Sequence, residues 1–306
     1  MAIAGVISTG NHPKFLWPGI IAIWGRDYND YPKEWPEMFD EESSDKNYEE
    51  EVGITGFGLA PVKAQGASIT SDSEEQGTVT RYTHITYALG FAVTMEELQD
   101  DLYEKVTGTR TPALARSHRI TEEIVCADVY NNAFDTDFVG SDGVPLLSAS
   151  HPNVTGGTFS NILSTAADLS ETALEDLITQ MSLATDDRGL IIALKSKKLV
   201  VHPHNWWNAN RILKSVFQND TANNAVNVLK MTDAISGGVM QCHYLDAPNS
   251  WFLRTDAPRG LRRFTRMKAD IEKDNDFGTK NALTSAVQRF SVGWSDPRGL
   301  FGSEGP

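Results

Sequence analysis

The 306-residue sequence is poor in cysteine: it contains only Cys126 and Cys242, which are far apart in the chain. Neither belongs to a C-x-x-C pair, so the sequence provides no basis for a zinc or redox motif. Two isolated cysteines are typical of small buried hydrophobic residues in a reducing compartment. We therefore predict no metal and no cofactor.

Long hydrophobic runs are also missing. The longest apolar stretch near the front of the chain is 19–24, whereas about 20 apolar residues are needed to cross a bilayer. The first five residues, Met1-Ala2-Ile3-Ala4-Gly5, lack the basic segment followed by an apolar run that marks a secretory signal. We expect a soluble protein that is made in the cytoplasm and does not contact a membrane.

Positive charge is scarce, because 27 Lys and Arg residues stand against 41 Asp and Glu residues, for a net charge of −14. A chain this acidic does not offer the broad basic face that phosphate contacts need. Neither a G-x-x-x-x-G-K-[ST] nor a G-x-G-x-x-G element opens a helix after a strand. The sequence thus argues against nucleotide binding and against sequence-specific DNA binding.

One basic cluster stands out in this acidic background. It consists of Arg254, Arg259, Arg262, Arg263, Arg266 and Lys268. Complementary charge sets the register between protein partners, and acidic runs occur at 37–51, 72–75 and 96–104. We predict that Arg262, Arg263 and Arg266 contact acidic segments of a neighbouring copy, with Glu74 and Glu75 as candidate contacts. A solvated strand face explains the cluster equally well.

The first third of the chain does not look like a compact domain. Residues 1–51 contain four prolines and show no sustained helix or strand period. Because exposed tryptophans are costly, Trp17, Trp24 and Trp35 must be covered, either by their own domain or by a neighbouring subunit. We favour the second interpretation, an N-terminal arm that grips a neighbour.

Residues 52–93 predict a long β-hairpin, with legs over 53–62 and 78–93 around a polar, acidic turn. A two-stranded ribbon is marginally stable in water by itself and needs a surface to lie on. We therefore expect Phe57, Tyr82 and Ile85 to contact another subunit. The arm and the hairpin together indicate an obligate assembly.

The remaining chain mixes helices and strands, which predicts an α+β fold. We expect helices at 94–106, 112–134 and 205–217, a helix that begins at Ser170, and buried strands at 190–194 and 198–201. The helix at 112–134 is over 30 Å long at about 1.5 Å per residue, the length of a domain spine.

Two motifs could carry chemistry. His202 and His204 lie close enough to share a metal ion, but spacing reveals no third ligand. Asp142, Ser148 and His151 suggest a nucleophile and a base, but no G-x-S-x-G elbow is present. For the first pair we favour a strand end that turns into a helix, and for the second a polar turn. We predict no catalytic and no metal-binding residues.

The order of these parts resembles major capsid proteins of tailed bacteriophages with the Hong Kong 97-type fold, in particular the major head subunits of Mu-like phages. Three runs of residues carry the resemblance: Asp142-Gly143-Val144-Pro145-Leu146-Leu147-Ser148-Ala149-Ser150-His151-Pro152, followed by Gly156-Gly157 and Ser160-Asn161; Leu199-Val200-Val201-His202-Pro203 before the Trp206 helix; and the C-terminal run from Val292 to Ser303. They occur in order over about residues 50–306.

The resemblance implies a division of the chain: an N-terminal arm (1–51), an extended β-hairpin loop (52–93), the first part of a peripheral domain with its spine helix at 112–134 (94–182), an axial domain (183–254) and the return of the peripheral domain (255–306). It further implies hexamers and pentamers of an icosahedral virion capsid around packaged double-stranded DNA. A separate scaffolding protein, a portal and possibly a decoration or cement protein would be partners.

Two other functions remain open. A cellular nanocompartment shell of the encapsulin type resembles the same fold, but its cargo-docking groove often uses an N-terminal helix, which the prolines of 1–51 disfavour. A soluble metal-dependent hydrolase that uses His202, His204 and an Asp belongs to a different class.

Overall fold

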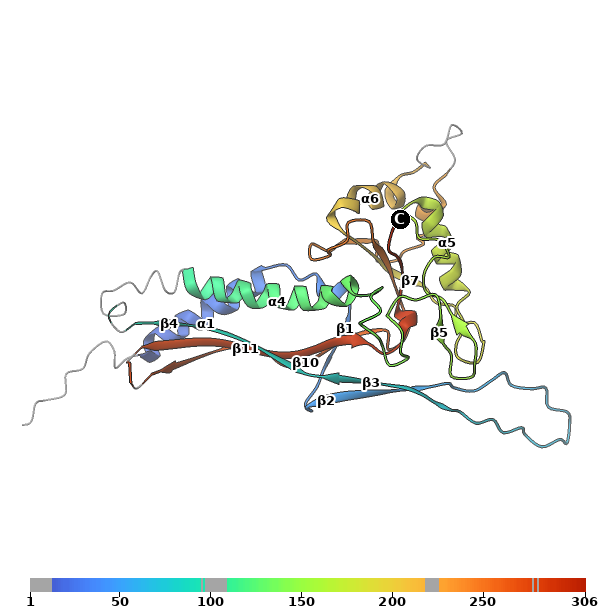
Figure 1. Ribbon diagram of the computed structural model, residues 1–306, viewed down its shortest axis with the longest axis horizontal. Helices are drawn as coiled ribbons and strands as arrows, with labels where there is room; N and C mark the ends of the chain where they lie inside the picture. Colours follow the sequence, from blue (N-terminus) through green and yellow to red (C-terminus); the bar gives the residue numbers. More distant parts are fainter. Residues whose placement is uncertain (1–12, 95, 97–108, 218–225, 277, 280) are drawn as a thin grey trace, which may run out of the picture. The chain divides into compact units, whose positions relative to one another are not determined.

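The computed structural model describes residues 13–94, 96, 109–217, 226–276, 278–279 and 281–306, with side chains from residue 21 on. The chain forms two compact units (Figure 1). Unit 1 contains residues up to 33 together with 84–124 and 265–291, and unit 2 contains 34–83, 125–264 and 292–306. The chain thus passes between the units several times, so neither unit is a continuous segment.

The described residues of unit 1 include a sheet and the helices α1 and α4, whose bounds are given below. The sheet has the order β1-β10-β11-β4. Strand β4 (Ile85–Val93) pairs antiparallel with β11 (Ala282–Trp294), with Ile85 opposite Phe290 and Val93 opposite Ala282. The long strand β10 (Leu261–Asn275) begins in unit 2, where it pairs with β1 (Asp40–Ser43).

The core of unit 1 forms where helix α1 (Pro13–Asp30) meets helix α4 (Thr111–Asn131). The Trp24 ring stacks on Tyr28 at 5.5 Å and meets the edge of His118 at 5.8 Å. A buried ion pair joins Arg119 to Glu122 at 2.6 Å, and Arg119 also donates to the carbonyl of Tyr28 at 2.9 Å. Both charges are therefore paired and hydrogen-bonded, as burial requires.

Unit 2 is built on a second sheet with the order β12-β9-β7-β8. Its strands are β7 (Ser196–Val201), β8 (Val239–Gln241), β9 (Trp251–Thr255) and β12 (Leu300–Ser303). Because side chains alternate between the faces of a strand, Val200 and Phe252 enter one core cluster, whereas Leu199 and Leu253 enter another. The end of α4 covers the first face through Tyr130.

The second face of this sheet is covered by helices α5 (Glu171–Ser182) and α6 (Trp206–Lys214) (Figure 1). Shorter elements complete the unit: the 3₁₀ turns η2 (Trp35–Glu37), η4 (Pro203–Asn205) and η5 (Pro297–Gly299), the short helix α7 (Val228–Met231), and the two-residue strands β5 (His151–Pro152) and β6 (Thr158–Phe159).

Several predicted elements are confirmed. Helix α4 matches the predicted spine at 112–134, and β7 matches the predicted strand at 198–201. Helix α5 begins after Ser170, whose side chain accepts a hydrogen bond from the backbone N–H of Ala173 at 3.2 Å. The strand predicted at 190–194 is wrong, because Ile191 is exposed and forms only an isolated bridge with Thr185. The helix predicted at 94–106 lies almost entirely outside the described residues.

The expectation that the N-terminal segment lacks a helix is wrong, since α1 spans 18 residues. Pro13 occupies the first helical position, where its missing N–H costs nothing. Pro18 lies inside the helix, where a proline removes one backbone hydrogen bond and costs about 3 kcal/mol, and the helix forms in spite of that cost. No helix of the described residues has the length and apolar character that a bilayer crossing needs.

The predicted hairpin is correct only in part, because residues 55–62 of the predicted first leg form a loop and not a strand. Strand β2 (Tyr48–Ile54) pairs with β3 (Gln76–Thr83), with Tyr48 opposite Thr83. After β3 the chain leaves this pair, and β4 joins the sheet of unit 1 instead. The alternating pattern of 78–93 is continuous across His84, so the pattern by itself does not reveal that the pairing partner changes there.

Candidate subunit-contact surface

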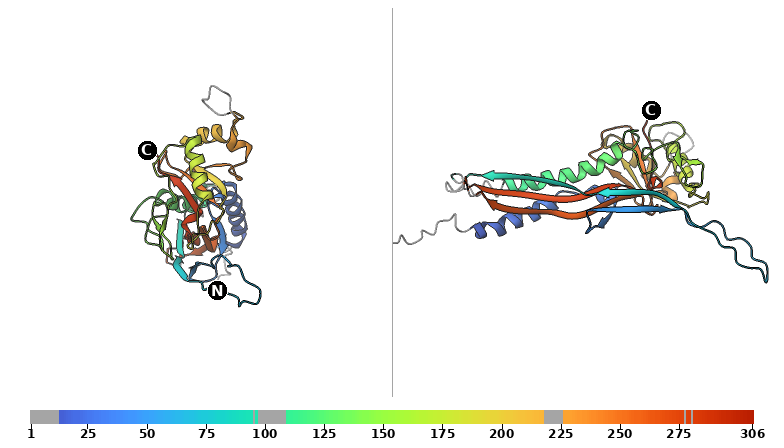
Figure 2. Two further views of the ribbon diagram at one scale, coloured as in Figure 1. Left: turned by 90° about the vertical axis from the view of Figure 1, so that its right-hand side faces the viewer. Right: turned by 60° about the horizontal axis from the view of Figure 1, so that its bottom comes forward.

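An exposed segment of unit 2 with several apolar side chains is the loop that joins β2 to β3, residues 55–75, which we call the hairpin loop (Figure 2). Val62 is 100% exposed and Leu59 is 82% exposed, and Phe57 and Ile69 are exposed as well. Lys63 is the only charged residue between 55 and 71. Contiguous apolar exposure of this kind marks a protein contact surface.

The two legs of the hairpin loop are tied together at its base. The N–H of Thr55 donates to the carbonyl of Glu75 at 3.1 Å, and the N–H of Glu75 donates to the Thr55 hydroxyl at 2.9 Å. Asp72 accepts from the N–H of Gly58 at 2.7 Å and pairs with Arg188 at 2.9 Å. The backbone N–H groups of Gly58 and Ser73 lower the pKa of Asp72. These contacts fix where the loop leaves the unit.

The basic cluster pairs with carboxylates of its own chain. Arg262 contacts Glu42 and Glu51, the latter at 3.1 Å. Arg263 pairs with Glu41 at 3.2 Å. The acidic run at 37–51 therefore supplies, within one chain, the partners that we expected from a neighbouring copy. Contact of Arg262, Arg263 and the half-buried Arg266 with another subunit remains a prediction.

Arg254 of strand β9 also pairs with a carboxylate of the acidic run at 37–51. Its guanidinium lies 2.7 Å from the carboxylate of Asp40, which Lys197 also contacts at 3.1 Å. Burial acts to raise the pKa of Asp40, but the two cations outweigh it and hold the pKa below its ordinary value. The acidic strand β1 is thus held electrostatically against the arginines of β9 and β10.

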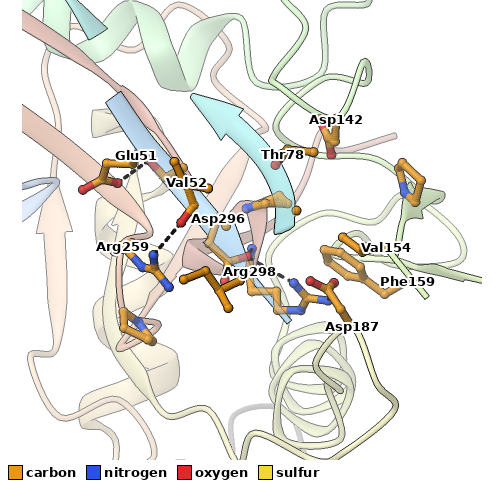
Figure 3. Close-up of a pocket in the computed structure, with 17 residues that line it drawn as sticks. Glu51, Val52, Thr78, Asp142, Val154, Phe159, Asp187, Arg259, Asp296 and Arg298 are labelled. Carbon is orange, nitrogen blue, oxygen red and sulfur yellow. Dashed lines mark hydrogen bonds and ion pairs between the residues drawn. The ribbon is translucent and has the colours of Figure 1, made fainter. Parts of the chain in front are cut away.

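A small pocket of about 130 Å³ lies at the base of the hairpin, between β2 and the loops at 142–159 and 295–298 (Figure 3). Arg298 fills one wall: its Nη2 donates to Asn153 at 2.9 Å and contacts Asp187 at 3.1 Å. Arg259 donates to the carbonyl of Val52 at 2.9 Å. Arg259 thus connects the hairpin to its own unit and Arg298 joins two loops of that unit, so the geometry supports a structural role for the pocket.

The residues of the Asp142 to Asn161 motif converge on one buried site. Nδ2 of Asn161 lies 2.7–3.1 Å from the carbonyl oxygens of Leu146, Pro297 and Leu300. Its Oδ1 accepts from the N–H of Ser148 at 2.8 Å and lies 3.2 Å from Nε2 of His151.

His151 has no ring nitrogen available to act as a base, since Nδ1 lies 2.6 Å from Asp142 and Nε2 faces Asn161. A nucleophile needs a hydrogen bond to its base, and both nitrogens of this base are occupied. The motif is therefore a buried hydrogen-bond network that joins the 140–164 loop to the C-terminal strand.

The histidine pair has a local role. Nδ1 of His202 accepts a hydrogen bond from the N–H of His204 at 3.1 Å and caps the turn η4. Burial and the neighbouring His204 lower the pKa of His202. Among the residues that the structure describes, no group of three or more His, Cys, Asp and Glu side chains is arranged to hold a metal ion.

The predicted contact residues fall into two groups. Phe57, Glu74, Glu75 and Ile85 are exposed, whereas Trp24, Trp35 and Tyr82 are buried within the chain's own units. The premise that only other copies can cover the aromatic side chains is therefore wrong at these three positions. The side chain of Trp17 lies outside the described residues. Our sequence reasoning missed Leu59, Val62 and Ile69, although their apolar spacing between glycines and prolines was a visible signal.

Comparison with known proteins gives the family. The model of the family described as "Phage capsid protein" matches residues 77–302, well over half of the chain. No curated protein matches the sequence.

Solved structures agree with this fold at low sequence identity. The mature capsid of bacteriophage PhiM1 aligns with a TM-score of 0.55 at 11% identity and covers 89% of this chain and 86% of that chain. The capsid of the native GTA particle aligns with a TM-score of 0.54 at 12% identity and covers 98% of this chain and 92% of that chain. The virus-like particle from Pyrococcus furiosus aligns with a TM-score of 0.52 at 12% identity and covers 94% of this chain and 98% of that chain.

The Hong Kong 97-like α+β fold that we predicted is thus confirmed. The chain belongs to the phage capsid protein family and is a structural component of a virion capsid, not an enzyme.

Proposed function

We propose that this chain is the major capsid protein of a tailed phage and assembles with copies of itself into hexamers and pentamers of an icosahedral shell that encloses double-stranded DNA. The family match supports the shell role. The observation that supports self-assembly most directly is the hairpin loop, because its large apolar side chains are between 62% and 100% exposed.

The hairpin loop reaches over an adjacent subunit in this proposal. Burial of apolar area stabilises by about 25 cal/mol per Å², and Phe57, Leu59 and Val62 supply that area at one segment. Two copies of a chain with a net charge of −14 repel each other over most of their surfaces. Residues 55–71 of the loop, where Lys63 is the only charged residue, are a place where such copies can touch without that repulsion.

The remaining assignments follow from the family resemblance. Residues 1–51 serve as the N-terminal arm, 94–182 and 255–306 as the peripheral domain around helix α4, and 183–254 as the axial domain. A Mu-like subfamily, a separate scaffolding protein, a portal and a decoration protein belong to the same proposal. The acidic chain weakly repels the packaged DNA, which it encloses without sequence-specific contacts.

A nanocompartment shell is the second candidate. Helix α1 favours it, because it removes our objection that the N-terminal segment cannot form a helix. The likeness to the Pyrococcus furiosus particle concerns the fold alone at 12% identity. A nanocompartment would co-purify with a cargo protein, whereas the phage capsid function predicts empty particles in the absence of other phage proteins.

Negative-stain electron microscopy of the expressed chain tests the proposed function. The proposal predicts rings or closed shells with fivefold and sixfold views. A uniform population of single subunits, or shells that always contain a host cargo protein, would argue against it.

A further inference from the structure

The charges of unit 2 are segregated along the sequence. Residues 188–232 contain seven basic residues, Arg188, Lys195, Lys197, Lys198, Arg211, Lys214 and Lys230, and a single acidic one, Asp220. The preceding 45 residues, 143–187, contain no Lys or Arg at all, but six acidic residues: Asp168, Glu171, Glu175, Asp176, Asp186 and Asp187. Residues 188–232, which we call the basic segment, therefore carry a net positive charge in a chain whose overall net charge is −14.

Arg188, Lys197 and Lys198 of this segment pair with carboxylates of the same chain. Helix α6 presents Arg211 and Lys214 on an exposed face. Its Ala209 and Ile212 are buried in the core of unit 2. Trp207, Arg211 and Lys214, at positions i, i+4 and i+7, share the opposite face and are exposed. Trp207 is 73% exposed, which is unusual because tryptophan carries a large apolar area. Tryptophan and arginine are the residues most enriched at the centres of protein interfaces.

Helix α5 presents the acidic segment. Leu174 and Leu177 point into the same core, while Asp176 is exposed and Glu175 is half-buried on the outer side. Asp168, just before the helix, is exposed too. Within the described part of the chain, no ion pair joins α5 to α6, although Asn208 of α6 donates to the carbonyl of Leu169 at 2.8 Å. The acidic residues of α5 and the basic residues of α6 therefore do not form ion pairs with each other within one copy.

Helix dipoles explain only part of this arrangement. Acidic residues are favourable at a helix start and basic residues at its end, by about 0.3–1 kcal/mol each. That preference covers Asp168, Arg211 and Lys214. It does not account for Asp176 in the second turn of α5, for the exposed Trp207 at the start of α6, or for 45 residues without a basic side chain.

We infer that the exposed face of α6 docks on the acidic face of α5 of a second copy of this chain. The inference rests on the proposed self-assembly. A closed ring needs two different, complementary surfaces on every copy, because the contact is head to tail. Helices α5 and α6 provide such a pair: Trp207 supplies the apolar anchor, and Arg211 and Lys214 face Glu175 and Asp176 of the neighbour.

Charge reversal tests this contact. The α6 variant, Arg211→Glu with Lys214→Glu, puts like charges against the neighbour's α5, as does the α5 variant, Glu175→Lys with Asp176→Lys. Like-charge contacts are strongly unfavourable, so each variant by itself should lower the fraction that sediments as particles by about tenfold or more. Circular dichroism checks that each variant folds. Should one unfold, Arg211→Gln with Lys214→Gln tests the same face without reversing its charge.

Mixing the two variants gives the decisive result. In the mixture, the acidic α6 of one variant meets the basic α5 of the other, and the remaining faces are unaltered. Association should return. Because six copies can alternate around a ring and five cannot, the restored assemblies should contain hexamers and lack pentamers.

The control reverses two exposed basic residues of unit 1, Arg116→Glu with Lys268→Glu, which changes the net charge equally. Particles from the control and none from the α6 variant support the contact. Equal loss in the control, normal particles from the α6 variant, or folded variants that fail to associate when mixed would overturn it. If the α6 variant assembles normally but loses binding to a double-stranded oligonucleotide, the face contacts DNA instead. Absence of particles from the unaltered chain counts against the proposed self-assembly, not against the α5–α6 contact within it.

Discussion

The guanidinium of Arg263 lies 3.9 Å from the centre of the Trp35 ring. The sequence predicts both residues as contacts to a neighbouring subunit, but they contact each other within one chain. Arg263 also pairs with Glu41 at 3.2 Å, and Trp35 is 3% exposed. The N-terminal acidic run and the C-terminal arginines thus cover each other. They stabilise the subunit before any assembly.

Charge reversal at this site should therefore unfold the subunit. The change Arg262→Glu with Arg263→Glu places two new carboxylates against Glu41, Glu42 and Glu51 and leaves those charges unpaired. We expect the free energy of unfolding to fall by roughly 3 kcal/mol or more, measured by urea denaturation. Lys268→Glu, an exposed change on the same strand, should shift it by no more than about 0.5 kcal/mol. A fully stable double variant that merely fails to assemble would restore the intersubunit interpretation.

Asn161 offers a test of the buried motif. The isosteric change Asn161→Asp replaces a donor that faces three carbonyl oxygens with an acceptor. Loss of buried hydrogen bonds and repulsion between oxygens should cost roughly 3 kcal/mol or more. Asn153→Asp is the matched control, because the Asn153 side chain accepts from Arg298 at 2.9 Å and a carboxylate accepts equally well. Equal unfolding free energies for the two variants would contradict the network.

His118 should make folding stability depend on pH. Burial lowers the pKa of this ring in the folded state, although Glu122 acts in the opposite direction. An unfolded histidine titrates near about 6.5. The unfolded chain therefore takes up the proton first, so stability is complete above that pH and falls as the pH drops below it. The variant His118→Phe should lose less stability than the unaltered chain between pH 7.5 and pH 5.5 by urea denaturation. An identical loss in both would show that other groups set the dependence.

The hairpin loop should affect assembly without affecting folding. Leu59→Ser with Val62→Ser removes apolar side chains that are 82% and 100% exposed, so the unfolding free energy should change by no more than about 0.5 kcal/mol. The yield of particles in electron micrographs should fall strongly. Phe138→Ser with Val139→Ser is the matched control at another exposed loop and should leave the yield unchanged. Normal particles from the loop variant would remove the loop from the contact surface.

Local patterns predicted helices α4 and α5 well, missed helix α1, and predicted the pairing partners of strands and charges poorly. The spine helix and the Ser170 cap follow from apolar spacing and capping chemistry, which depend on neighbouring residues. Strand β4 pairs with β11, and Arg262 pairs with Glu42. In both cases the partners are about 200 residues apart in the sequence, and the spacing of residues in the sequence carries no information about such partners. The tryptophans show the same limit, because a pattern indicates that Trp24 must be covered but not which residues cover it.

Sedimentation velocity of the purified chain tests the central claim most directly. A capsid subunit should sediment as megadalton particles or as rings of several subunits. If the protein sediments only as a 33.7 kDa species over the whole accessible concentration range, with or without phage scaffolding protein, it does not build a shell, and the proposed function is wrong.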